Sequence, residues 1–197
     1  MKKIVLALAV ILSFGLIPDV QAEEFENVQL ELRDYSEIEV PSGTFIPVMA
    51  MAEISTAVCN EGYKVRFITT NDLYIKESNV IPKDTYIYGY IEELHEPVVG
   101  TNASMRIKLT RMVYADGCEI PMQGYIYTSN GNLIGGGISE PVKWVRMPHY
   151  QARFHYVNLS LRPSQERKMG VHTTIQSGSQ QIVVLTAPIY VSHTLIN

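Results

Sequence analysis

Histidine is the residue type in this sequence best suited to metal binding or proton transfer, and the chain has five of them. His149, His155 and His172 fall in one stretch, the first two only six residues apart. Neutral imidazole binds zinc and can act as a general base, so these three could form a metal or acid–base site. No HExxH or HxH motif is present. We therefore favour solvated or hydrogen-bonded histidines on strands and loops, and the sequence predicts no metal ion and no cofactor.

Two other catalytic arrangements can be assembled from the residue types present. A serine hydrolase could use Ser164, His172 and Asp116, although the chain has no G-x-S-x-G motif. A glycosidase could use paired carboxylates from a cluster of three glutamates. The cluster comprises Glu92, Glu93 and Glu96. It also suits the solvated end of a strand, where acids keep a sheet edge from wrong pairing, and we predict that the protein is not an enzyme.

Aromatic and basic side chains could bind partners without catalysis. Trp144 is the only tryptophan, and Tyr150, Phe154 and Tyr156 follow it closely. These aromatic residues could line a glycan site, whereas Trp144 could equally be a core residue. The basic stretch 162–170 could meet an anionic surface, such as phospholipid or lipopolysaccharide headgroups. Its basic residues are Arg162, Arg167 and Lys168. A plain solvated loop explains them as well, and we favour that interpretation.

The elements that must position these residues are β-strands, because helical spacing is scarce and period-2 alternation is frequent. The clearest alternation places Met105, Ile107 and Leu109 on one face, with polar residues between them. Asp116-Gly117 is a strong hairpin signal, since tight turns need a positive φ. The strands Met105–Tyr114 and Glu119–Tyr127 should therefore pair antiparallel.

Tyrosines occupy every second position at Tyr86, Tyr88 and Tyr90, which predicts a strand with the rings on one face. Pro47 lies in an apolar strand and predicts an edge or bulged position for it. Three successive glycines, Gly135–Gly137, predict a flexible connection or a close approach of two chain segments. The predicted fold is all-β, a small barrel or sandwich of mostly antiparallel strands.

The N-terminal residues have the pattern of a secretory signal peptide. Lys2 and Lys3 precede an apolar run, and Val20-Gln21-Ala22 fits a cleavage site after Ala22. An uncleaved anchor is the alternative, but the run is shorter than the roughly 20 residues that span a bilayer. We expect a signal peptide at 1–22, an acidic N-terminal arm at 23–42 and a single β-domain at 43–197. The mature chain would carry 14 basic and 19 acidic residues, which argues against nucleic-acid binding.

Two cysteines remain in the predicted mature chain, Cys59 and Cys118. An exported chain meets an oxidising compartment, so we expect one disulfide between them. Closing a loop of this length would contribute about 4 kcal/mol by the chain-entropy argument. A metal site is not expected from two isolated cysteines without C-x-x-C spacing.

Short motifs between 42 and 126 occur in an order that is similar to a known module. A G-T-x-I-P start leads to an I-P turn that enters a strand ending in Gly, and a strand ending in D-G follows. The matching residues are Gly43, Thr44, Ile46, Pro47, Ile81, Pro82, Thr85, Gly89, Asp116 and Gly117. This stretch, about half of the mature domain, resembles the C-terminal β-barrel of the TrbI-type conjugation and type IV secretion channel proteins. The resemblance implies a barrel that packs beside copies or partners in the envelope, and it transfers no catalytic residue.

Three departures from that family stand out. Asp84 occupies a position where the family has Gly. A signal peptide stands in place of the family's inner-membrane helix and Pro-rich linker. The second half of the domain, including 147–170, does not match the family pattern.

The sequence as a whole predicts an exported structural or assembly component of the bacterial envelope, belonging to a secretion or conjugation type complex. Its partners would be other envelope proteins or copies of itself, in the periplasm or peripherally on the outer membrane. The expected contact residues are Tyr86, Tyr88, Tyr90 and Trp144, together with Gly135–Gly137 and the arm. A periplasmic glycan-binding module is the alternative, and an envelope hydrolase or metal enzyme is the third hypothesis.

Overall fold

Strands make up all the regular secondary structure of the residues described by the computed structural model, 35–151 and 156–194. The all-β prediction is therefore confirmed. Among these residues, no helix meets the length and hydropathy needed to cross a membrane. The predicted signal peptide and the first part of the predicted arm lie outside the described residues.

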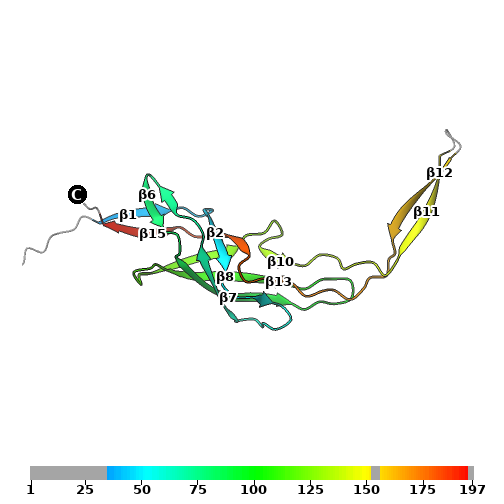
Figure 1. Ribbon diagram of the computed structural model, residues 1–197, viewed down its shortest axis with the longest axis horizontal. Coiled ribbons are helices and arrows are strands. Elements are labelled where there is room, and N and C mark those ends of the chain that lie inside the picture. Colours follow the sequence, from blue (N-terminus) through cyan, green and yellow to red (C-terminus); the bar gives the residue numbers. More distant parts are fainter. Residues whose placement is uncertain (1–34, 152–155, 195–197) are drawn as a thin grey trace, which may run out of the picture. The chain divides into compact units, whose positions relative to one another are not determined.

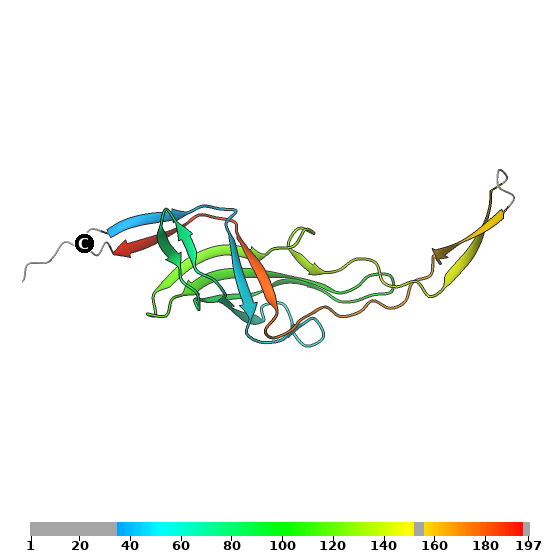
Figure 2. The ribbon, with the colours of Figure 1, turned by 45° about the horizontal axis from the view of Figure 1, so that its top comes forward.

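Six antiparallel strands close into a barrel (Figures 1 and 2). They follow the order β8-β7-β4-β2-β14-β9, and β9 pairs back with β8 to complete the ring. The barrel strands are β2 (Phe45–Ala50), β4 (Lys64–Thr69), β7 (Tyr86–His95), β8 (Ser104–Val113), β9 (Glu119–Ile126) and β14 (Gln180–Leu185). Closure removes the open sheet edges from this part of the molecule.

The remaining strands are attached to this barrel or pair in two-stranded ribbons. β10 (Leu133–Gly135) extends the sheet from β8. The ribbons are β1 (Tyr35–Val40) with β15 (Ile189–Thr194), β3 (Ile54–Ser55) with β13 (Thr174–Ile175), β5 (Leu73–Ile75) with β6 (Ser78–Ile81), and β11 (Trp144–Gln151) with β12 (Tyr156–Pro163). Part of the predicted acidic arm is thus a strand, β1, that pairs within its own chain.

The barrel interior is filled by the apolar residues of the alternating strands. Met105, Ile107 and Leu109 of β8 are fully buried, as their period-2 spacing predicts. Phe67 of β4 and Ile87 of β7 are buried beside them in the same core cluster. The predicted hairpin is also confirmed, since β8 and β9 pair antiparallel and Gly117 in their turn has φ 86°.

Asp84 has a backbone conformation that glycine adopts more easily than other residues. Its φ is 65°, in the left-handed region that glycine enters without steric cost. The turn is held by the Asp84 amide, which donates to the Thr69 carbonyl at 3.1 Å, and by the Thr85 amide, which donates to Thr69 Oγ1 at 2.9 Å. These bonds fix the entry of the chain into β7.

The edge position predicted for the strand containing Pro47 is wrong. β2 lies between β4 and β14 in the closed ring. Its ladder with β4 begins at Val48, one residue after the proline. The Pro47 carbonyl accepts a hydrogen bond from the Thr70 amide at 3.1 Å. In a β-strand the nitrogen and the carbonyl of one residue point to the same neighbouring strand, so the Pro47 nitrogen also points toward β4. The paired residues of β4 end at Thr69, so no acceptor of the β2–β4 ladder needs a donor at Pro47. A missing N–H therefore costs no ladder bond there.

The predicted disulfide is absent, because both cysteines are free thiols. Cys59 is buried, and its amide donates to the Ser55 carbonyl at 2.9 Å. The neighbouring Thr56 hydrogen-bonds to Thr173, which in turn donates to the carbonyl of Ala103, the residue before β8. Cys118 is exposed in the turn after the other end of β8. The ten residues of β8 extend about 33 Å, far more than the roughly 7 Å between Cα atoms that a disulfide allows.

These positions predict different reactivities for the two thiols. In the native protein, a small thiol reagent should modify Cys118 and leave Cys59 unmodified, because only Cys118 is exposed. Unfolding in denaturant should release the second thiol. Mass spectrometry of the labelled chain checks both steps. A chain that offers no thiol even in denaturant would show that the bond does form.

Candidate functional site

The three tyrosines of β7 lie on the outside of the barrel, on a surface shared with β4 and β8. Tyr86, Tyr88 and Tyr90 are half-buried, whereas the residues between them face the core. The register places Lys64 opposite Tyr90 and Arg66 opposite Tyr88. We call this surface the tyrosine face. Its members are Lys64, Arg66, Tyr86, Tyr88, Tyr90 and Arg111.

Cations stack on two of these rings. The Arg66 guanidinium lies 5.6 Å from the centroid of the Tyr86 ring, and the Arg111 guanidinium lies 4.9 Å from that of Tyr88. Such contacts orient the arginines along the sheet surface and leave their N–H donors available at the edges. Rings and cations together form a flat surface suited to carboxylates and other planar anions.

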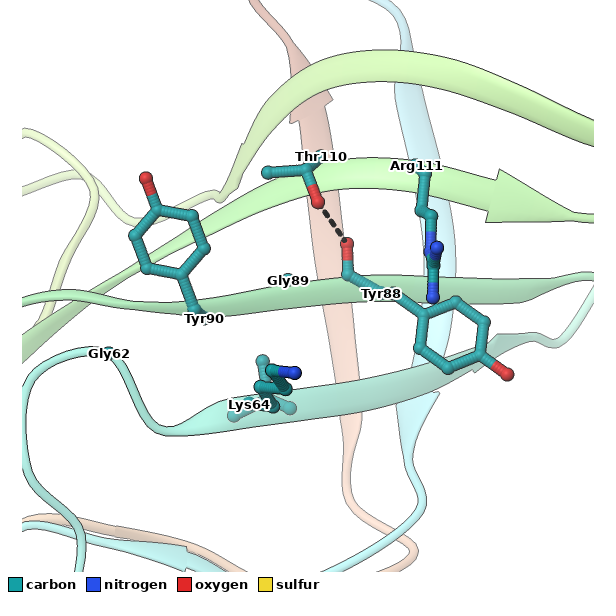
Figure 3. Close-up of a pocket in the computed structure, with 8 residues that line it drawn as sticks. Gly62, Lys64, Tyr88, Gly89, Tyr90, Thr110 and Arg111 are labelled. Carbon is teal, nitrogen blue, oxygen red and sulfur yellow. Dashed lines mark hydrogen bonds between the residues drawn. The ribbon is translucent and has the colours of Figure 1, made fainter.

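A β-bulge shapes this surface. Pairing of β7 with β8 shifts between Tyr88 and Gly89, so Thr110 is an extra residue on β8. The Thr110 hydroxyl donates to the Tyr88 carbonyl at 3.5 Å (Figure 3). Beside it lies a shallow pocket of about 330 Å³. The pocket is lined by Gly62, Lys64, Val65, Tyr88, Gly89, Tyr90, Thr110 and Arg111.

The charge of the tyrosine face is incompletely neutralised. Arg111 pairs with Glu119 at 3.3 Å, and both side chains are about half exposed. Within the described ranges, neither Lys64 nor Arg66 has a carboxylate oxygen within 4.0 Å. Two exposed cations beside a row of rings therefore remain available to an acidic partner.

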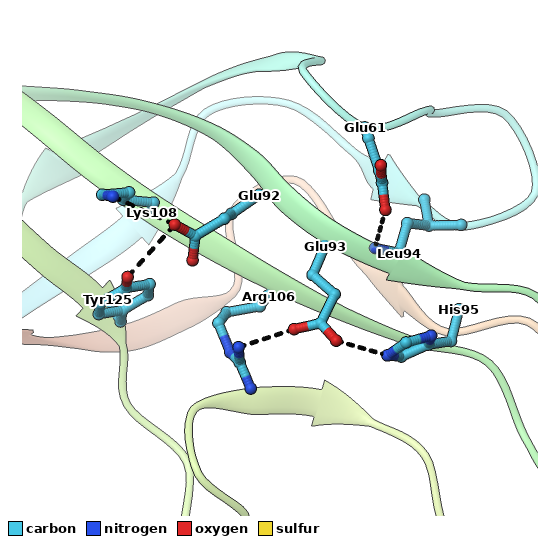
Figure 4. Close-up of polar contacts among 8 residues, drawn as sticks. All are labelled: Glu61, Glu92, Glu93, Leu94, His95, Arg106, Lys108 and Tyr125. Atoms are coloured by element: carbon cyan, nitrogen blue, oxygen red, sulfur yellow. Dashed lines mark hydrogen bonds and ion pairs between the residues drawn. The ribbon is translucent and has the colours of Figure 1, made fainter.

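The predicted carboxylate pair is used in ion pairs next to this face (Figure 4). Lys108 donates from Nζ to Glu92 Oε1 at 3.1 Å, and Arg106 Nη1 lies 2.7 Å from Glu93 Oε2. The second oxygen of Glu93 lies 2.7 Å from the His95 ring nitrogen. A second bulge between Ile91 and Glu93 puts the two consecutive acids on the outer surface. The arrangement is an ion-pair network, as the solvated-strand interpretation expects.

The same network changes the acidity of its members. The hydrogen bond to Glu92 raises the pKa of the Lys108 ammonium above its ordinary value. Burial, followed by the hydrogen bond to Glu92, raises the pKa of the Tyr125 phenol. Both groups therefore keep their protons at neutral pH and act as donors.

The predicted hydrolase residues are not brought together. Ser164 donates to the Glu166 carbonyl at 3.0 Å, and His172 Nδ1 lies 3.2 Å from Thr56 Oγ1. Asp116 accepts from the Cys118 amide in the β8–β9 turn. This turn follows the end of β8 opposite to Asn102 and Ala103, which hydrogen-bond to Val171, the residue before His172. A triad of these three residues is therefore not formed.

The predicted histidine site is only partly covered by the structure. His155 and the side chain of His149 lie outside the described residues. In the described part of the chain, no three His, Cys, Asp or Glu side chains are grouped to hold a metal ion.

Trp144 is not a core residue, because 60% of it is exposed at the start of β11. The side chains of Tyr150 and Tyr156, and the whole of Phe154, lie outside the described set. The glycan hypothesis for these aromatic residues therefore remains a prediction.

Of the two alternatives for the three glycines, the structure has the close approach. Gly135–Gly137 all have positive φ, and the Gly136 amide donates to the Ala103 carbonyl at 2.8 Å. A Cβ on Gly135 would lie 2.1 Å from Thr173 Oγ1. The segment packs against its own chain before β8.

Comparison with known proteins gives a likeness in structure and none in sequence. No protein-family model matches this chain, and no curated protein matches it. Among solved structures, the chain is similar to ComB10 of the Com type IV secretion system of Helicobacter pylori. The TM-score is 0.46 and the identity 11%, over 80% of this chain and 97% of that chain.

Proposed function

We propose that this protein is an exported, non-enzymatic assembly component of the bacterial envelope, and that it works through surfaces of its β-barrel. The observation that carries the proposal is the tyrosine face, where exposed cations lie among half-buried rings on a closed, rigid frame. Tyrosine and arginine are the residue types enriched in protein interfaces, because they combine large contact area with specific hydrogen bonds. The order of motifs in 42–126 supports a secretion or conjugation type complex as the setting.

The sequence also supplies a segment of opposite charge. Residues 23–34 carry five acids, Glu23, Glu24, Glu26, Glu31 and Asp34, against one arginine. Opposite charges on two parts of one chain favour association of copies, in which the arm of one copy meets the tyrosine face of another. Envelope proteins with acidic surfaces would be alternative partners of the same face.

Deletion of residues 23–34 tests this mode of assembly. The deletion stops at Asp34 because Tyr35–Val40 form β1, which pairs with β15. We expect the mature chain, Glu23–Asn197, to form a discrete oligomer and the shortened chain to be mostly monomeric in light scattering after size-exclusion chromatography. Unchanged association of the shortened chain, with itself and with its envelope partners, would rule out the arm as the contact.

A further inference from the structure

The pocket on the tyrosine face is formed by side chains from three strands. Tyr88 and Tyr90 project from β7 on either side of Gly89 (Figure 3). The register places Arg111 of β8 opposite Tyr88 and Lys64 of β4 opposite Tyr90. Each ring therefore has a cation beside it, and the two cations lie on opposite sides of β7. The volume of about 330 Å³ is at the small end of the range for small-molecule sites.

One of the three tyrosine rings has no cation stacked on it. Arginines lie over the rings of Tyr86 and Tyr88, whereas no Lys or Arg of the described residues lies over Tyr90. Tyr90 is half-buried, so its ring is held in place while part of it stays accessible. The face of an aromatic ring carries partial negative charge and attracts the slightly positive C–H groups of a flat, saturated ring. Tyr90 can therefore act as a stacking surface for a sugar.

The rest of the lining is polar and offers no aliphatic contact. Gly89 faces the core, so the floor between the tyrosines is main chain. Val65, the aliphatic member of the lining, is buried on the core side of β4. A leucine or valine of a partner would find no aliphatic surface in this pocket. The exposed side chains of Lys64, Thr110 and Arg111 instead offer hydrogen bonds to hydroxyl groups.

The charges of the lining favour a negatively charged ligand. None of the eight lining residues is acidic. Lys64 has no carboxylate oxygen within 4.0 Å among the described residues. Arg111 pairs with Glu119 at 3.3 Å, but both side chains are about half exposed. Such a pair contributes little to stability, so Arg111 can exchange Glu119 for the carboxylate of a ligand.

We propose that this pocket binds a saccharide unit that carries a carboxylate. The sugar ring would stack on Tyr90, and its carboxylate would accept hydrogen bonds from Lys64 Nζ and the Arg111 guanidinium. Two envelope polymers contain such units, the muramic acid of peptidoglycan and the ketodeoxyoctulosonate of lipopolysaccharide. A chain exported as proposed above would meet both. The inference rests on that export and on the geometry of the pocket, and it does not depend on self-association.

Paired ligands isolate the contribution of the carboxylate. The chain Glu23–Asn197 would be titrated with N-acetylmuramic acid and with its methyl ester, and saturation-transfer NMR would measure the binding. Ketodeoxyoctulosonate and its methyl ester form the second arm, which distinguishes the two sources. We expect at least one acid to bind about tenfold more tightly than its ester, because only the acid can pair with the cations. The protons of the sugar ring should receive the strongest saturation.

Three single substitutions locate the site. Lys64→Gln should reduce the preference for the acid about fivefold and leave binding of the ester unchanged, because it removes one exposed charge. Tyr90→Leu should weaken acid and ester alike, and circular dichroism confirms that this variant keeps the fold. Lys76→Gln, at an exposed position in the β5–β6 turn, is the matched control and should bind as the wild type does. Equal binding of acid and ester in both arms, or an unchanged preference in Lys64→Gln, would overturn the proposal.

The result can be separated from the outcome of the assembly proposal. The titration is repeated on the chain without residues 23–34, so that an arm lying in the pocket would be recognised by tighter sugar binding after its removal. A monomeric chain that binds the acid sugar would support the saccharide site and contradict self-assembly. A chain that associates but binds neither acid, with or without residues 23–34, would overturn the saccharide site alone.

Discussion

Replacing Gly89 by alanine should lower the free energy of unfolding by about 3 kcal/mol or more, the largest stability effect expected from one methyl group in this barrel. Gly89 faces the core of the barrel between Tyr88 and Tyr90. An added Cβ would lie 2.2 Å from the Lys108 carbonyl oxygen and 3.0 Å from the Leu109 Cα. Both atoms belong to the backbone of β8, which is held by β7 on one side and β9 on the other. The clash therefore cannot be relieved by turning a side chain.

Urea unfolding followed by circular dichroism measures this loss, and Gly43→Ala is the matched control. Gly43 has φ 83°, but a Cβ there meets nothing within 4 Å. That substitution should cost about 1 kcal/mol, from backbone strain alone. If the two variants lost equal stability, the close approach of β7 and β8 at Gly89 would not be as the structure has it. Gly89→Ala should also disturb the tyrosine face, because Thr110 follows the contacted residues at the bulge.

Reversing the charge of the tyrosine face should weaken self-association on the order of a hundredfold, because like charges would then meet at the contact. The variant is Lys64→Glu with Arg66→Glu. Both side chains are exposed and have no carboxylate partner among the described residues, so the change should leave the barrel stable. Sedimentation velocity measures the association constant. The wild-type association should also weaken as salt is added, since exposed charges are screened.

The control carries the same charge change elsewhere. Lys76→Glu with Lys143→Glu alters two exposed lysines outside β4, β7 and β8, one in the β5–β6 turn and one just before β11. This variant should associate nearly as the wild type does. Adding Glu23→Lys and Glu24→Lys to the Lys64→Glu, Arg66→Glu chain should recover association. Equal weakening in the control would mean that net charge, and not this face, determines assembly.

Local patterns predicted the strands well, because a barrel strand must alternate between core and solvent. Met105, Ile107 and Leu109 are buried as their spacing requires, and Asp116-Gly117 forms the hairpin turn. The alternation is interrupted at β-bulges, and a single sequence does not show where a bulge will occur. After Leu109, the next buried residue of β8 is Met112, because Thr110 is the extra residue of a bulge.

Local sequence patterns could not predict the contacts between segments that are far apart in the chain. Pro47 suggested an edge, but the pairing of β2 with β14 joins residues more than 130 positions apart and leaves the proline where no ladder bond is needed. Two cysteines in a chain predicted to be exported suggested a disulfide, yet β8 separates them. The row of tyrosines was recognisable in the sequence. Its cations were not, because Lys64 and Arg66 come from another strand and join the rings only through the register.

The solution mass of the purified chain Glu23–Asn197, the product of the predicted signal-peptide cleavage, tests the central claim most directly. Light scattering after size-exclusion chromatography, at low and at high salt, should show a discrete oligomer that dissociates as salt is added. That result would agree with assembly through the tyrosine face and the acidic arm. A single monomeric species at high protein concentration and low salt would contradict assembly of this chain with copies of itself.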